Sequence, residues 1–579
     1  MKISPFLESI VSNDQAAAIK NRTIQNHNHY IRDIITLAHD RGDTNCILSL
    51  DQQKAFDRVS HDWLLKVLEA NNFGPKIIKW IQILYLNATS KVIINGTLSN
   101  AFCLGRGVRQ GDPLSMLLYV LTLEPLLECI RQDTDIDGIH TPNGKTQKLL
   151  AFADDTNFFP GKHLAVRKII KHFELFGKCS GSKVNLDKSK GMIIGKGGRL
   201  KTIKEVTWVD RLKMFGIIYK NSRDPIDKQA WGELIKEIEI ILDKFRTFDT
   251  TIFGRANIVN TLVEPKLIYL AHVDTPHKKI TKKYNTLVRN FIFTGTISAI
   301  RHTTLIQDKR KGGINLHDLD SKLKSIRLKT TLKIIQDTHY TIAHYYISGR
   351  IRNHIKYDNT KPHFFGTLPP FYKHLVKTIK QHTDILSLNP KKFYDTLVTQ
   401  LATPLHEQVK RSPTDIDPNT LFKDLHNNTH ISQTQKNITY RLLFGITPTT
   451  EGYKRKTNQI YHCKFCKLKQ ETEEHIYYTC TALHKLKIAF LKLLRIANYT
   501  NRDLYRLIFL GLTTPNLGRD IRRYRQTLAQ LYRDTIWYGR VDAQFKKQNI
   551  TDNALRDIFL AKAKHYIETK VDLHTLAKL

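Results

Sequence analysis

Two short apolar segments that end at aspartate residues constrain most strongly what this chain can fold into. Residues 46–50 (CILSL) predict a β-strand that ends at Asp51. Residues 148–153 and 156–159 predict two more strands, and the pair Asp154-Asp155 lies between them at the tip of a tight hairpin. Because such strands alternate with helical segments over the first 225 residues, the sequence predicts an α+β fold.

The spacing of apolar residues predicts the elements around these strands. The Asn95-Gly96 pair between two apolar segments predicts a β-hairpin over residues 91–104. Residues 105–113 predict a glycine-punctuated loop. We expect helices at about 1–45, 61–70, 75–86, 114–131 and 164–176, a strand at 191–194, and helices from 227–248 onward to the end of the chain.

The three aspartates suit a metal site. Adjacent carboxylates at a hairpin tip repel each other unless a cation neutralises them, whereas a purely structural turn favours Asp beside Gly or Asn. Carboxylates at the ends of two strands can converge on a pair of Mg²⁺ ions, which are hard cations that prefer oxygen ligands. The alternative is an ordinary acidic turn, because adjacent acidic residues also arise by chance in a long chain.

Basic residues greatly outnumber acidic ones. The chain has 91 Lys and Arg against 53 Asp and Glu, a net charge of +38 and a pI near 9.8. Such an excess attracts polyanions, and nucleic acid is the commonest large polyanion in a cell. A well-solvated surface is the alternative, although solubility needs far less charge. Charge alone does not separate a polymerase from a chromatin or ribosomal protein.

Length and hydropathy narrow the class of protein further. A chain of 579 residues is too long for one core, so we expect several domains. The most apolar segment, residues 116–127, is too short to cross a bilayer and contains Glu124 and Pro125. The N-terminus lacks the pattern of a secretory signal. We therefore expect an intracellular, soluble protein with no membrane partner.

The cysteines fall into two groups. Cys463, Cys466, His475 and Cys480 have the spacing C-x2-C-x8-H-x4-C, and three thiolates with one imidazole can close a tetrahedral Zn²⁺ site. His462 and His484 are alternatives for the histidine, and free buried cysteines are the alternative to zinc. The remaining cysteines lie among apolar residues and are predicted to be buried, reduced thiols: Cys46, Cys103, Cys129 and Cys179.

Several segments together resemble the reverse transcriptases of non-LTR (LINE-type) retrotransposons. LSLDQQKAFDRV at 48–59, GRGVRQGDPLS at 105–115 and AFADD at 151–155 resemble motifs A, B and C of this family, in the family's order and spacing. The other similar segments are DQAAAIKNRTI at 14–24, SGSKVNLDKSK at 180–190 (motif D), LKMFGI at 212–217 (motif E), KGGINLHDL at 311–319 and the cysteine–histidine cluster. The resemblance thus covers nearly the whole chain.

The resemblance implies a role for individual residues. Asp51, Asp154 and Asp155 fall on the three ligands of two Mg²⁺ ions. Phe56 falls on the aromatic steric gate that excludes a ribose 2′-hydroxyl, and a core phenylalanine is the alternative. The remaining implied contacts are Gln110 and Gly111 with the incoming nucleotide, Gly107 and Pro113 with the template–nucleotide pair, and Arg109 with phosphate.

Two further basic residues are candidates for contact with the triphosphate. Arg22 matches a fingers position that could hold the phosphates, and a solvated loop arginine is an equal alternative. Lys188, or less favourably Lys183, could protonate the leaving pyrophosphate, because lysine has three rotatable donors and a tunable pKa. In so basic a chain, a surface charge is the simpler reading of either lysine.

The resemblance also implies an architecture and partners. It predicts a right-hand polymerase with partial fingers, a palm with an antiparallel sheet, and a helical thumb, followed by a mostly helical region with a zinc knuckle. The implied parts are fingers and palm at 1–225, thumb at 226–310, a helical region at 311–445, the zinc segment at 446–490 and a helical tail at 491–579. The implied partners are an RNA template, a DNA primer or target and dNTPs, and the implied location is the nucleus.

The chain also departs from the family pattern. It begins almost at the DQ segment, so we expect the fingers to be incomplete and the endonuclease of many relatives to be absent. Met116 stands where the family usually has proline, and Gln52-Gln53 replace an aromatic–acidic pair. The leading hypothesis is an RNA-directed DNA polymerase, and the alternative is an inactive nucleic-acid-binding remnant. A zinc-containing chromatin protein is a third reading, which leaves the three polymerase motifs unexplained.

Overall fold

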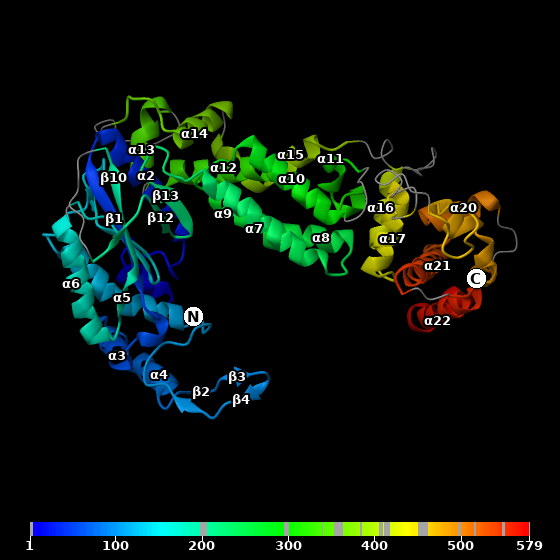
Figure 1. The fold of residues 1–579 in the computed structure, drawn as a ribbon, viewed down its shortest axis with the longest axis horizontal. Helices are drawn as coiled ribbons and strands as arrows, with labels where there is room; N and C mark the ends of the chain where they lie inside the picture. The colour runs from blue at the N-terminus through cyan, green and yellow to red at the C-terminus, as the bar shows by residue number, and fades with distance from the viewer. Residues whose placement is uncertain are drawn as a thin grey trace. The chain divides into compact units, whose positions relative to one another are not determined.

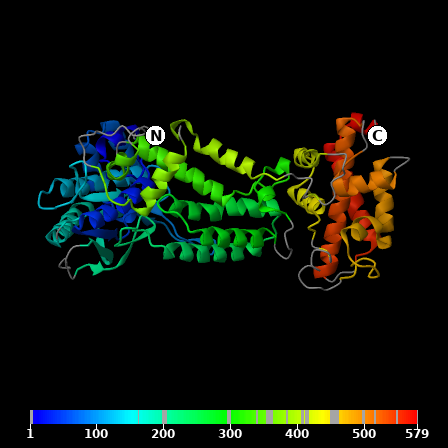
Figure 2. The same cartoon turned by 90° about the horizontal axis from the view of Figure 1, so that it is seen from above.

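The structure is a computed structural model of the chain, shown in Figures 1 and 2. It divides into two compact units: Met1–Trp231, Tyr269–Thr275 and Ile326–Leu388 form unit 1, and Gly232–Ile268, Pro276–Ser325 and Asn389–Leu579 form unit 2. The residues it describes are 4–161, 163–196, 205–293, 300–337, 340–351, 363–382, 385–403, 409, 417–447, 449, 461–495, 500–513, 517–546 and 550–577.

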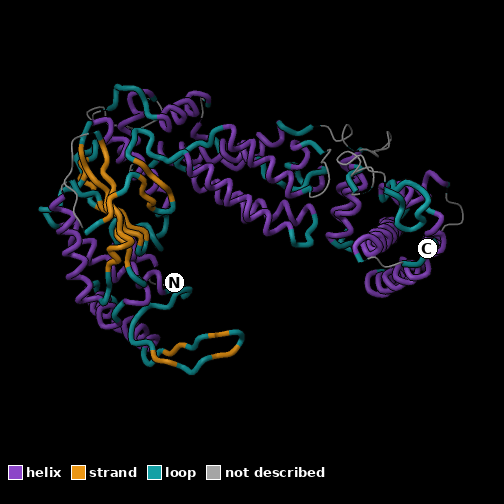
Figure 3. Tube along the Cα trace, viewed as in Figure 1, coloured by secondary structure: helices purple, strands orange, loops and turns teal. Residues whose placement is uncertain are grey.

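A five-stranded sheet lies at the centre of unit 1 (Figure 3). Its order is β11-β10-β1-β9-β8, with β1 antiparallel to both β10 and β9, and β11 parallel to β10. The sheet is therefore almost wholly antiparallel. The strands are β1 (Thr44–Gln52), β8 (Leu149–Phe152), β9 (Asp155–Phe158), β10 (Val184–Gly195) and β11 (Thr207–Trp208).

Helices α3 (His61–Ala70), α5 (Ser115–Gln132) and α6 (His163–Ser180) pack against one another and against the sheet. Alternate residues of β1, namely Cys46, Leu48 and Leu50, join the same core cluster as the apolar residues of these helices. This alternation is what a strand with one face against helices requires. Helix α2 (Ile24–Arg41) instead contacts β10.

Three short antiparallel ribbons complete the strands of unit 1. Turn Asn95-Gly96, with φ of 49° and 83°, joins β3 (Ile93–Ile94) to β4 (Thr97–Leu98), as the sequence predicted. The same ribbon continues where β2 (Thr89–Ser90) pairs with β5 (Phe102–Cys103). The other pairs are β6 (Ile139–His140) with β7 (Thr146–Gln147) and β12 (Arg211–Met214) with β13 (Ile217–Lys220).

The remaining helices of unit 1 include α4 (Pro75–Tyr85), α13 (Thr341–Ile347) and α14 (Pro370–Gln381). The fully buried Arg32–Asp33 ion pair of α2 lies under Phe371, whose ring centroid is 3.4 Å from the Arg32 guanidinium carbon. Helix α7 (Gln229–Arg246) and helix α12 (Leu319–Gln336) each begin in one unit and end in the other.

Unit 2 is helical over most of its described length. Its helices include α8 (Ile252–Ile258), α10 (Lys278–Ile292), α11 (His302–Leu305), α15 (Pro390–Gln400), α16 (Pro418–Asn427), α17 (Gln433–Phe444), α19 (His484–Leu494), α20 (Asn501–Leu510), α21 (Arg519–Phe545) and α22 (Asp552–Lys570). Helix α9 (Glu264–Ala271) crosses from unit 2 into unit 1, and α23 (Leu573–Ala577) follows α22. The chain as described is thus mixed α+β and mostly helical.

Two expectations from the sequence were wrong. Residues 1–45 are not one helical stretch, because residues 11–23 form a loop between α1 (Leu7–Ile10) and α2. Ser, Asn and Asp at positions 12–14 favour turns over helix, since their side chains compete for backbone groups. The cysteines outside the cluster are not all buried: Cys46 is, but Cys103, Cys129 and Cys179 are exposed.

The exposed cysteines have local explanations. Cys103 lies on the short β2–β5 ribbon, both of whose strands are largely exposed, and Cys129 lies on the solvent face of α5. Apolar neighbours along the sequence do not decide which helical face a residue occupies. Among the helices that the structure describes, none combines the length and the apolarity needed to cross a membrane.

Candidate functional site

The register of the sheet brings Asp51 to the β8–β9 hairpin. Leu50 of β1 pairs with Thr156 of β9, so the next position on β1, Asp51, lies beside Asp155. Directly opposite residues of an antiparallel pair project to the same face of a sheet. Asp154 precedes Asp155 in the hairpin turn, so three carboxylates from two segments 100 residues apart meet at one edge of the sheet.

A buried serine of β10 holds the backbone at Asp51. The pairing of β1 with β10 shifts register between Ser49 and Asp51. The buried hydroxyl of Ser189 accepts a hydrogen bond of 3.2 Å from the Asp51 N–H and donates one of 2.8 Å to the carbonyl of Asn185. The extra residues of this register shift lie on β10, between Asn185 and Lys190, so β1 stays regular up to Asp51. The Asp51 side chain is exposed, while its backbone N–H is held by the buried Ser189 hydroxyl.

Two donors from different segments hold the Asp155 carboxylate. Its Oδ1 accepts a hydrogen bond of 3.1 Å from Asn157 Nδ2, and its Oδ2 accepts one of 3.2 Å from the backbone N–H of Phe215. Phe215 lies in the β12–β13 turn, where its φ is 46°. Its carbonyl in turn accepts a hydrogen bond from the Tyr269 hydroxyl. Residues of motif E thus support a carboxylate of motif C.

Burial and mutual repulsion perturb the hairpin carboxylates. Burial raises the pKa of Asp154, and the nearby charge of Asp51 raises it further. Burial also raises the pKa of Asp155, the hydrogen bonds from Asn157 and Phe215 oppose that rise, and the charges of Asp154 and Asp51 add to it. Carboxylates that raise one another's pKa favour a bound cation, which would neutralise the repulsion.

The ring of Phe56 stacks on Tyr119, a residue close to the carboxylates. Phe56 begins the short 3-10 helix η2 (Phe56–Arg58), and its ring stacks on Tyr119 of α5 with centroids 4.5 Å apart and planes 16° apart. Burial raises the pKa of Tyr119 well above its usual range, and the charge of Asp154 adds to the rise, which places Tyr119 near that carboxylate. Sequence reasoning did not single out Tyr119, because it resembles an ordinary core residue of an apolar helix.

The glycine-punctuated loop at 105–113 is tied to the segment that carries Phe56. Val108 donates a backbone hydrogen bond of 2.8 Å to the Phe56 carbonyl, and Gly107 donates one of 2.7 Å to the Val59 carbonyl. Gly107 has φ of 95°, and a Cβ there would lie 2.9 Å from the Asp57 carbonyl oxygen. Only glycine fits this position without a shift in the backbone.

The nucleotide contacts implied by the resemblance lie on exposed parts of unit 1. Gln110 and Gly111 are exposed in the loop just described, and Gly111 has φ of 87°. Lys188 is exposed on β10, three residues beyond the partner of Asp51, and Lys183 is exposed just before that strand. Each side chain is therefore accessible to a ligand.

Arg22 has partners that the sequence did not predict. Its guanidinium donates hydrogen bonds to the backbone carbonyls of Ser12, Gln15 and Val11, those to Gln15 and Val11 both being 2.9 Å long. These bonds tie the loop between α1 and α2 to the start of α2. A contact between Arg22 and a triphosphate stays a prediction, and the structure adds a structural role for the same side chain.

The four cysteine and histidine residues of the cluster come together in unit 2. One ligand atom from each of Cys463, Cys466, His475 and Cys480 lies within 4.8 Å of the others. The sulfurs of Cys463 and Cys480 are 3.8 Å apart, and Cys466 Sγ is 3.2 Å from His475 Nε2. This set contains His475 rather than either alternative histidine.

The spacing of these atoms fits tetrahedral zinc. Zinc–sulfur bonds of about 2.3 Å place two sulfurs of a tetrahedron roughly 3.8 Å apart. A hydrogen bond from the Cys480 thiol lowers the pKa of Cys463 below its ordinary value. Lys467, with φ of 56°, donates a backbone hydrogen bond of 2.9 Å to the Cys463 carbonyl and closes the turn between the first two cysteines. The cluster could hold zinc.

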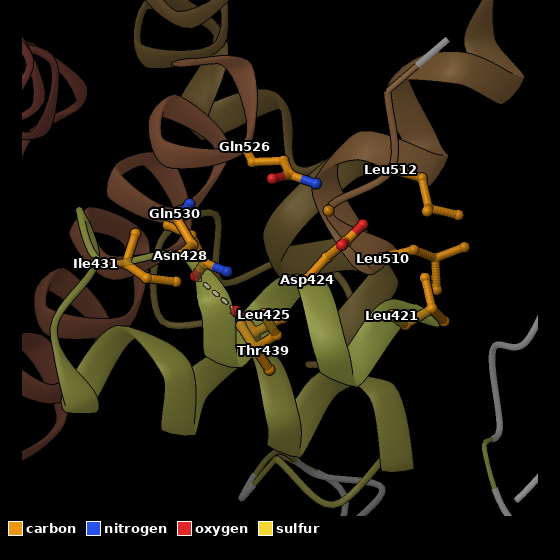
Figure 4. Close-up of a pocket in the computed structure, with 11 residues that line it drawn as sticks. Leu421, Asp424, Leu425, Asn428, Ile431, Thr439, Leu510, Leu512, Gln526 and Gln530 are labelled. Atoms are coloured by element: carbon orange, nitrogen blue, oxygen red, sulfur yellow. Dashed lines mark hydrogen bonds between the residues drawn. The ribbon is translucent and has the colours of Figure 1, made fainter. Parts of the chain in front are cut away.

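A small cavity in unit 2 is too small to be a nucleotide-binding site. It lies among α16, α17, α20 and α21, and Figure 4 shows its lining. Thr439 donates a hydrogen bond of 2.5 Å to Gln530 at its floor. Its volume of about 20 Å³ holds roughly one water molecule, far less than a nucleoside triphosphate.

Comparison with known proteins matches the part of the chain that builds the carboxylate site. Residues 1–219 match the reverse transcriptase (RNA-dependent DNA polymerase) family. The chain is 28% identical over 303 residues to the uncharacterized 149 kDa protein of transposon TX1 from Xenopus laevis, covering 51% of this chain and 23% of that protein.

Other relatives are polyproteins of R2 retrotransposable elements. One from Popillia japonica is 29% identical over 160 residues, covering 28% of this chain and 25% of the relative. One from Drosophila melanogaster is 31% identical over 142 residues, covering 24% and 13% respectively. The chain thus spans a quarter or less of the length of each of these relatives.

Telomerases are among the solved structures that are similar to the chain. A telomerase from Candida tropicalis in complex with a fragment of telomeric RNA has a TM-score of 0.33 and 11% identity, covering 59% of this chain and 55% of that one. A telomerase from Candida albicans has a TM-score of 0.30 and 13% identity, covering 59% and 56%. From the sequence match and the relatives, residues 1–219 belong to the reverse transcriptase family, and the chain is related to the polyproteins of non-LTR retrotransposons.

Proposed function

We propose that the chain is an RNA-directed DNA polymerase that extends a DNA 3′-hydroxyl on an RNA template. The observation that carries this proposal is the meeting of Asp51, Asp154 and Asp155 at one sheet edge within the reverse transcriptase domain. Phosphoryl transfer depends mainly on positioning and charge neutralisation rather than on covalent chemistry. A rigid sheet that presents three carboxylates suits both requirements.

The three carboxylates would hold two Mg²⁺ ions. The donor set supports this, because it consists of hard oxygen ligands, and burial together with mutual repulsion raises the pKa of Asp154 and Asp155. Bound Mg²⁺ would lower the pKa of the primer hydroxyl and neutralise the triphosphate. The protein itself orients these ligands through the Ser189 hydroxyl at Asp51 and the Phe215 N–H at Asp155.

Phe56 would select deoxynucleotides. Its ring is braced by Tyr119, and its carbonyl is bonded to Val108, so it moves little relative to the loop that follows. A braced ring can reject a ribose 2′-hydroxyl by steric clash. In the same proposal Gln110 and Gly111 contact the incoming nucleotide, Lys188 protonates the pyrophosphate, and Arg22 contacts the triphosphate.

The cysteine–histidine cluster would bind one structural Zn²⁺ and present a nucleic-acid contact. Its four ligands fit a closed tetrahedral site, which leaves no open position for catalysis. Lys464, Lys467 and Lys469 lie between the ligands and would contact phosphates. The partners in this proposal are an RNA template, a DNA primer or target, and dNTPs.

The architecture proposed for the chain is a right-hand polymerase. In this proposal the five-stranded sheet with α3, α5 and α6 would form the palm, and the helices within residues 226–310 would form the thumb. The boundaries at 225, 310, 445 and 490 stay predictions, and expression of single segments with a measurement of folding tests them. A nuclear location is likewise a prediction, which imaging of the tagged chain in cells tests.

Primer extension tests the proposed activity. Purified protein with a DNA primer annealed to an RNA template should incorporate labelled dNTPs in Mg²⁺, and Asp154→Ala should abolish incorporation. If wild type and variant are equally inert, the proposal fails. Salt-dependent RNA binding without extension would instead assign the chain a binding role.

A further inference from the structure

The side chain of Gln15 lies fully buried against the hairpin that carries Asp154 and Asp155. Gln15 has 0% exposure, and it lies in the loop between α1 and α2, where its backbone forms an isolated bridge with Ala151 of β8. A buried primary amide needs hydrogen-bond partners, since an unpaired polar group in the interior costs free energy. The hydrogen-bond partners of Gln15 connect it to the hairpin that carries Asp154 and Asp155.

The Gln15 side-chain amide makes hydrogen bonds with both backbone groups of Ala153. Its Oε1 accepts a hydrogen bond of 3.0 Å from the Ala153 N–H, and its Nε2 donates one of 3.5 Å to the Ala153 carbonyl. The same Oε1 accepts a further hydrogen bond of 2.9 Å from the Ala17 N–H. One side chain thus occupies both backbone groups of the residue immediately before Asp154.

Ala153 is a residue whose conformation needs support. It has φ of 55°, in the left-handed region that residues with a Cβ rarely adopt. With Asp154 it forms the turn that closes the Phe152–Asp155 pair of the hairpin. Strained conformations persist only where their surroundings hold them. The hydrogen bonds from Gln15 are such a constraint, and they come from outside the hairpin.

The loop that carries Gln15 is itself fixed to the sheet. Ala16 donates a backbone hydrogen bond of 3.0 Å to the Ala151 carbonyl, and Ala151 donates one of 2.8 Å to the Asp14 carbonyl. The carbonyl of Gln15 accepts a hydrogen bond from Arg22. The backbone of Gln15 is therefore held on both sides, so its side chain can transmit a fixed position to Ala153.

We propose that Gln15 is a positioning residue that fixes the Asp154 and Asp155 carboxylates for metal binding through the backbone of Ala153. This inference rests on the proposed polymerase function for its catalytic consequence, but the clamp itself is a property of the fold. A small error in the position of a reacting group can cost about 100-fold in rate. The loop at 12–17 thus helps to position the carboxylates, although it contacts no reacting atom.

The test compares Gln15→Met with a matched buried control. Methionine keeps the length of the side chain but removes both polar groups. Gln530 is also buried, at 4% exposure, and loses its hydrogen bond with Thr439 in Gln530→Met, far along the chain in unit 2. Both variants lose a buried glutamine, and only one of them touches the hairpin.

Two readouts separate the clamp from general stability. In hydrogen–deuterium exchange, peptides that contain residues 151–156 should exchange at least about tenfold faster in Gln15→Met and unchanged in Gln530→Met. In primer extension, Gln15→Met should lower kcat about 10- to 100-fold, leave KM for dNTP within about twofold, and need more Mg²⁺ for half-maximal rate. Excess Mg²⁺ should restore part of the rate.

Each outcome decides the proposal. Unchanged exchange at 151–156 in Gln15→Met overturns the clamp, and equal losses of kcat in the two variants without a change in Mg²⁺ requirement overturn the positioning role. If wild type itself does not extend a primer, the proposed function fails while the exchange experiment still decides the clamp. If Gln15→Met does not fold, Gln15→Asn replaces it, since asparagine keeps a neutral amide but is one methylene shorter and cannot reach Ala153 in the same way, and the same outcomes decide the proposal.

Discussion

At the scale of single residues, the carboxylates of the β8–β9 hairpin are placed where their charge is costly to the fold. Burial is the largest cause of the raised pKa of Asp154, and the Asp51 charge adds to it. A folded-state pKa above the ordinary value means that this carboxyl stabilises the fold most below pH 3.8. That contribution is lost as the pH rises through the folded pKa.

This sign leads to a prediction for stability. At neutral pH and without Mg²⁺, Asp154→Asn should raise the melting temperature, because it removes a partly buried charge and its repulsion with Asp51 and Asp155. The gain should shrink as the pH falls through the raised pKa of Asp154, because the native carboxyl then becomes protonated and loses its charge. Scanning calorimetry at several pH values measures both effects, with the exposed Asp187→Asn as control. A lower melting temperature at neutral pH would contradict this account.

A second prediction at this scale concerns sugar selection. Phe56→Val should raise ribonucleotide incorporation relative to deoxynucleotide incorporation by about 10- to 100-fold, because the clash with the 2′-hydroxyl is removed. Competition between dNTP and rNTP in single-nucleotide extension measures the ratio. Phe73→Val, a partly buried phenylalanine that packs on the same core cluster, should leave the ratio unchanged. An unchanged ratio in Phe56→Val would leave Phe56 as a core residue.

At the scale of elements, the sequence predicted the secondary structure around the site well. Helix α3 was predicted within its observed bounds, α4 and α5 to within one residue at each end, and the three strands that present the aspartates to within two. These elements follow from local patterns, since apolar spacing and turn residues lie within each segment. The motifs located the carboxylates for the same reason.

Contacts between distant segments could not be predicted in this way. Phe215 supports Asp155 across 60 positions, and Gln15 supports Ala153 across 138. No local sequence pattern indicates either contact, because each of these two hydrogen bonds depends on how a loop packs against the sheet. The sequence offers one hint of the second contact, because the polar Gln15 lies beside the apolar residues of DQAAAI. The structure explains this position, since the Gln15 side chain is fully buried.

The loop at 105–113 gives a prediction at the scale of elements. Gly107→Ala should lower activity about 100-fold, because alanine would be strained at φ of 95° and would press on the Asp57 backbone. Gly105→Ala is the matched control in the same loop, where a Cβ meets no atom within 4 Å. Circular dichroism checks that both variants fold. Equal activity of the two variants would show that the loop tolerates a shift at Gly107.

At the scale of the whole molecule, the structure brings together, within each unit, one set of the candidate metal ligands that the sequence singled out. Unit 1 holds the carboxylates, and unit 2 holds the cysteine–histidine cluster. A buried ion pair between Glu471 of the cluster segment and Arg540 of α21 connects the cluster to the longest helix described in unit 2. Metal binding should therefore stabilise more of unit 2 than the cluster segment alone.

Zinc content tests this connection. The purified chain should contain about one Zn²⁺, and Cys466→Ser should lose it and lower the melting temperature of unit 2, because a ligand is removed from a closed site. Cys103→Ser, which alters an exposed cysteine outside the cluster, should keep both the zinc and the melting temperature. Metal analysis and calorimetry make the comparison. Full zinc content in Cys466→Ser would rule out the proposed ligand set.

The central claim is that carboxylates from β1 and from the β8–β9 hairpin form one Mg²⁺-dependent catalytic site. The most direct test is the rate of single-nucleotide addition to a DNA primer on an RNA template, for wild type and Asp51→Asn over a range of Mg²⁺ concentrations. We predict Mg²⁺-dependent addition by wild type and a loss of more than about 100-fold in the variant, because a ligand of the ions is removed. Addition by Asp51→Asn at the wild-type rate and Mg²⁺ requirement would contradict the account.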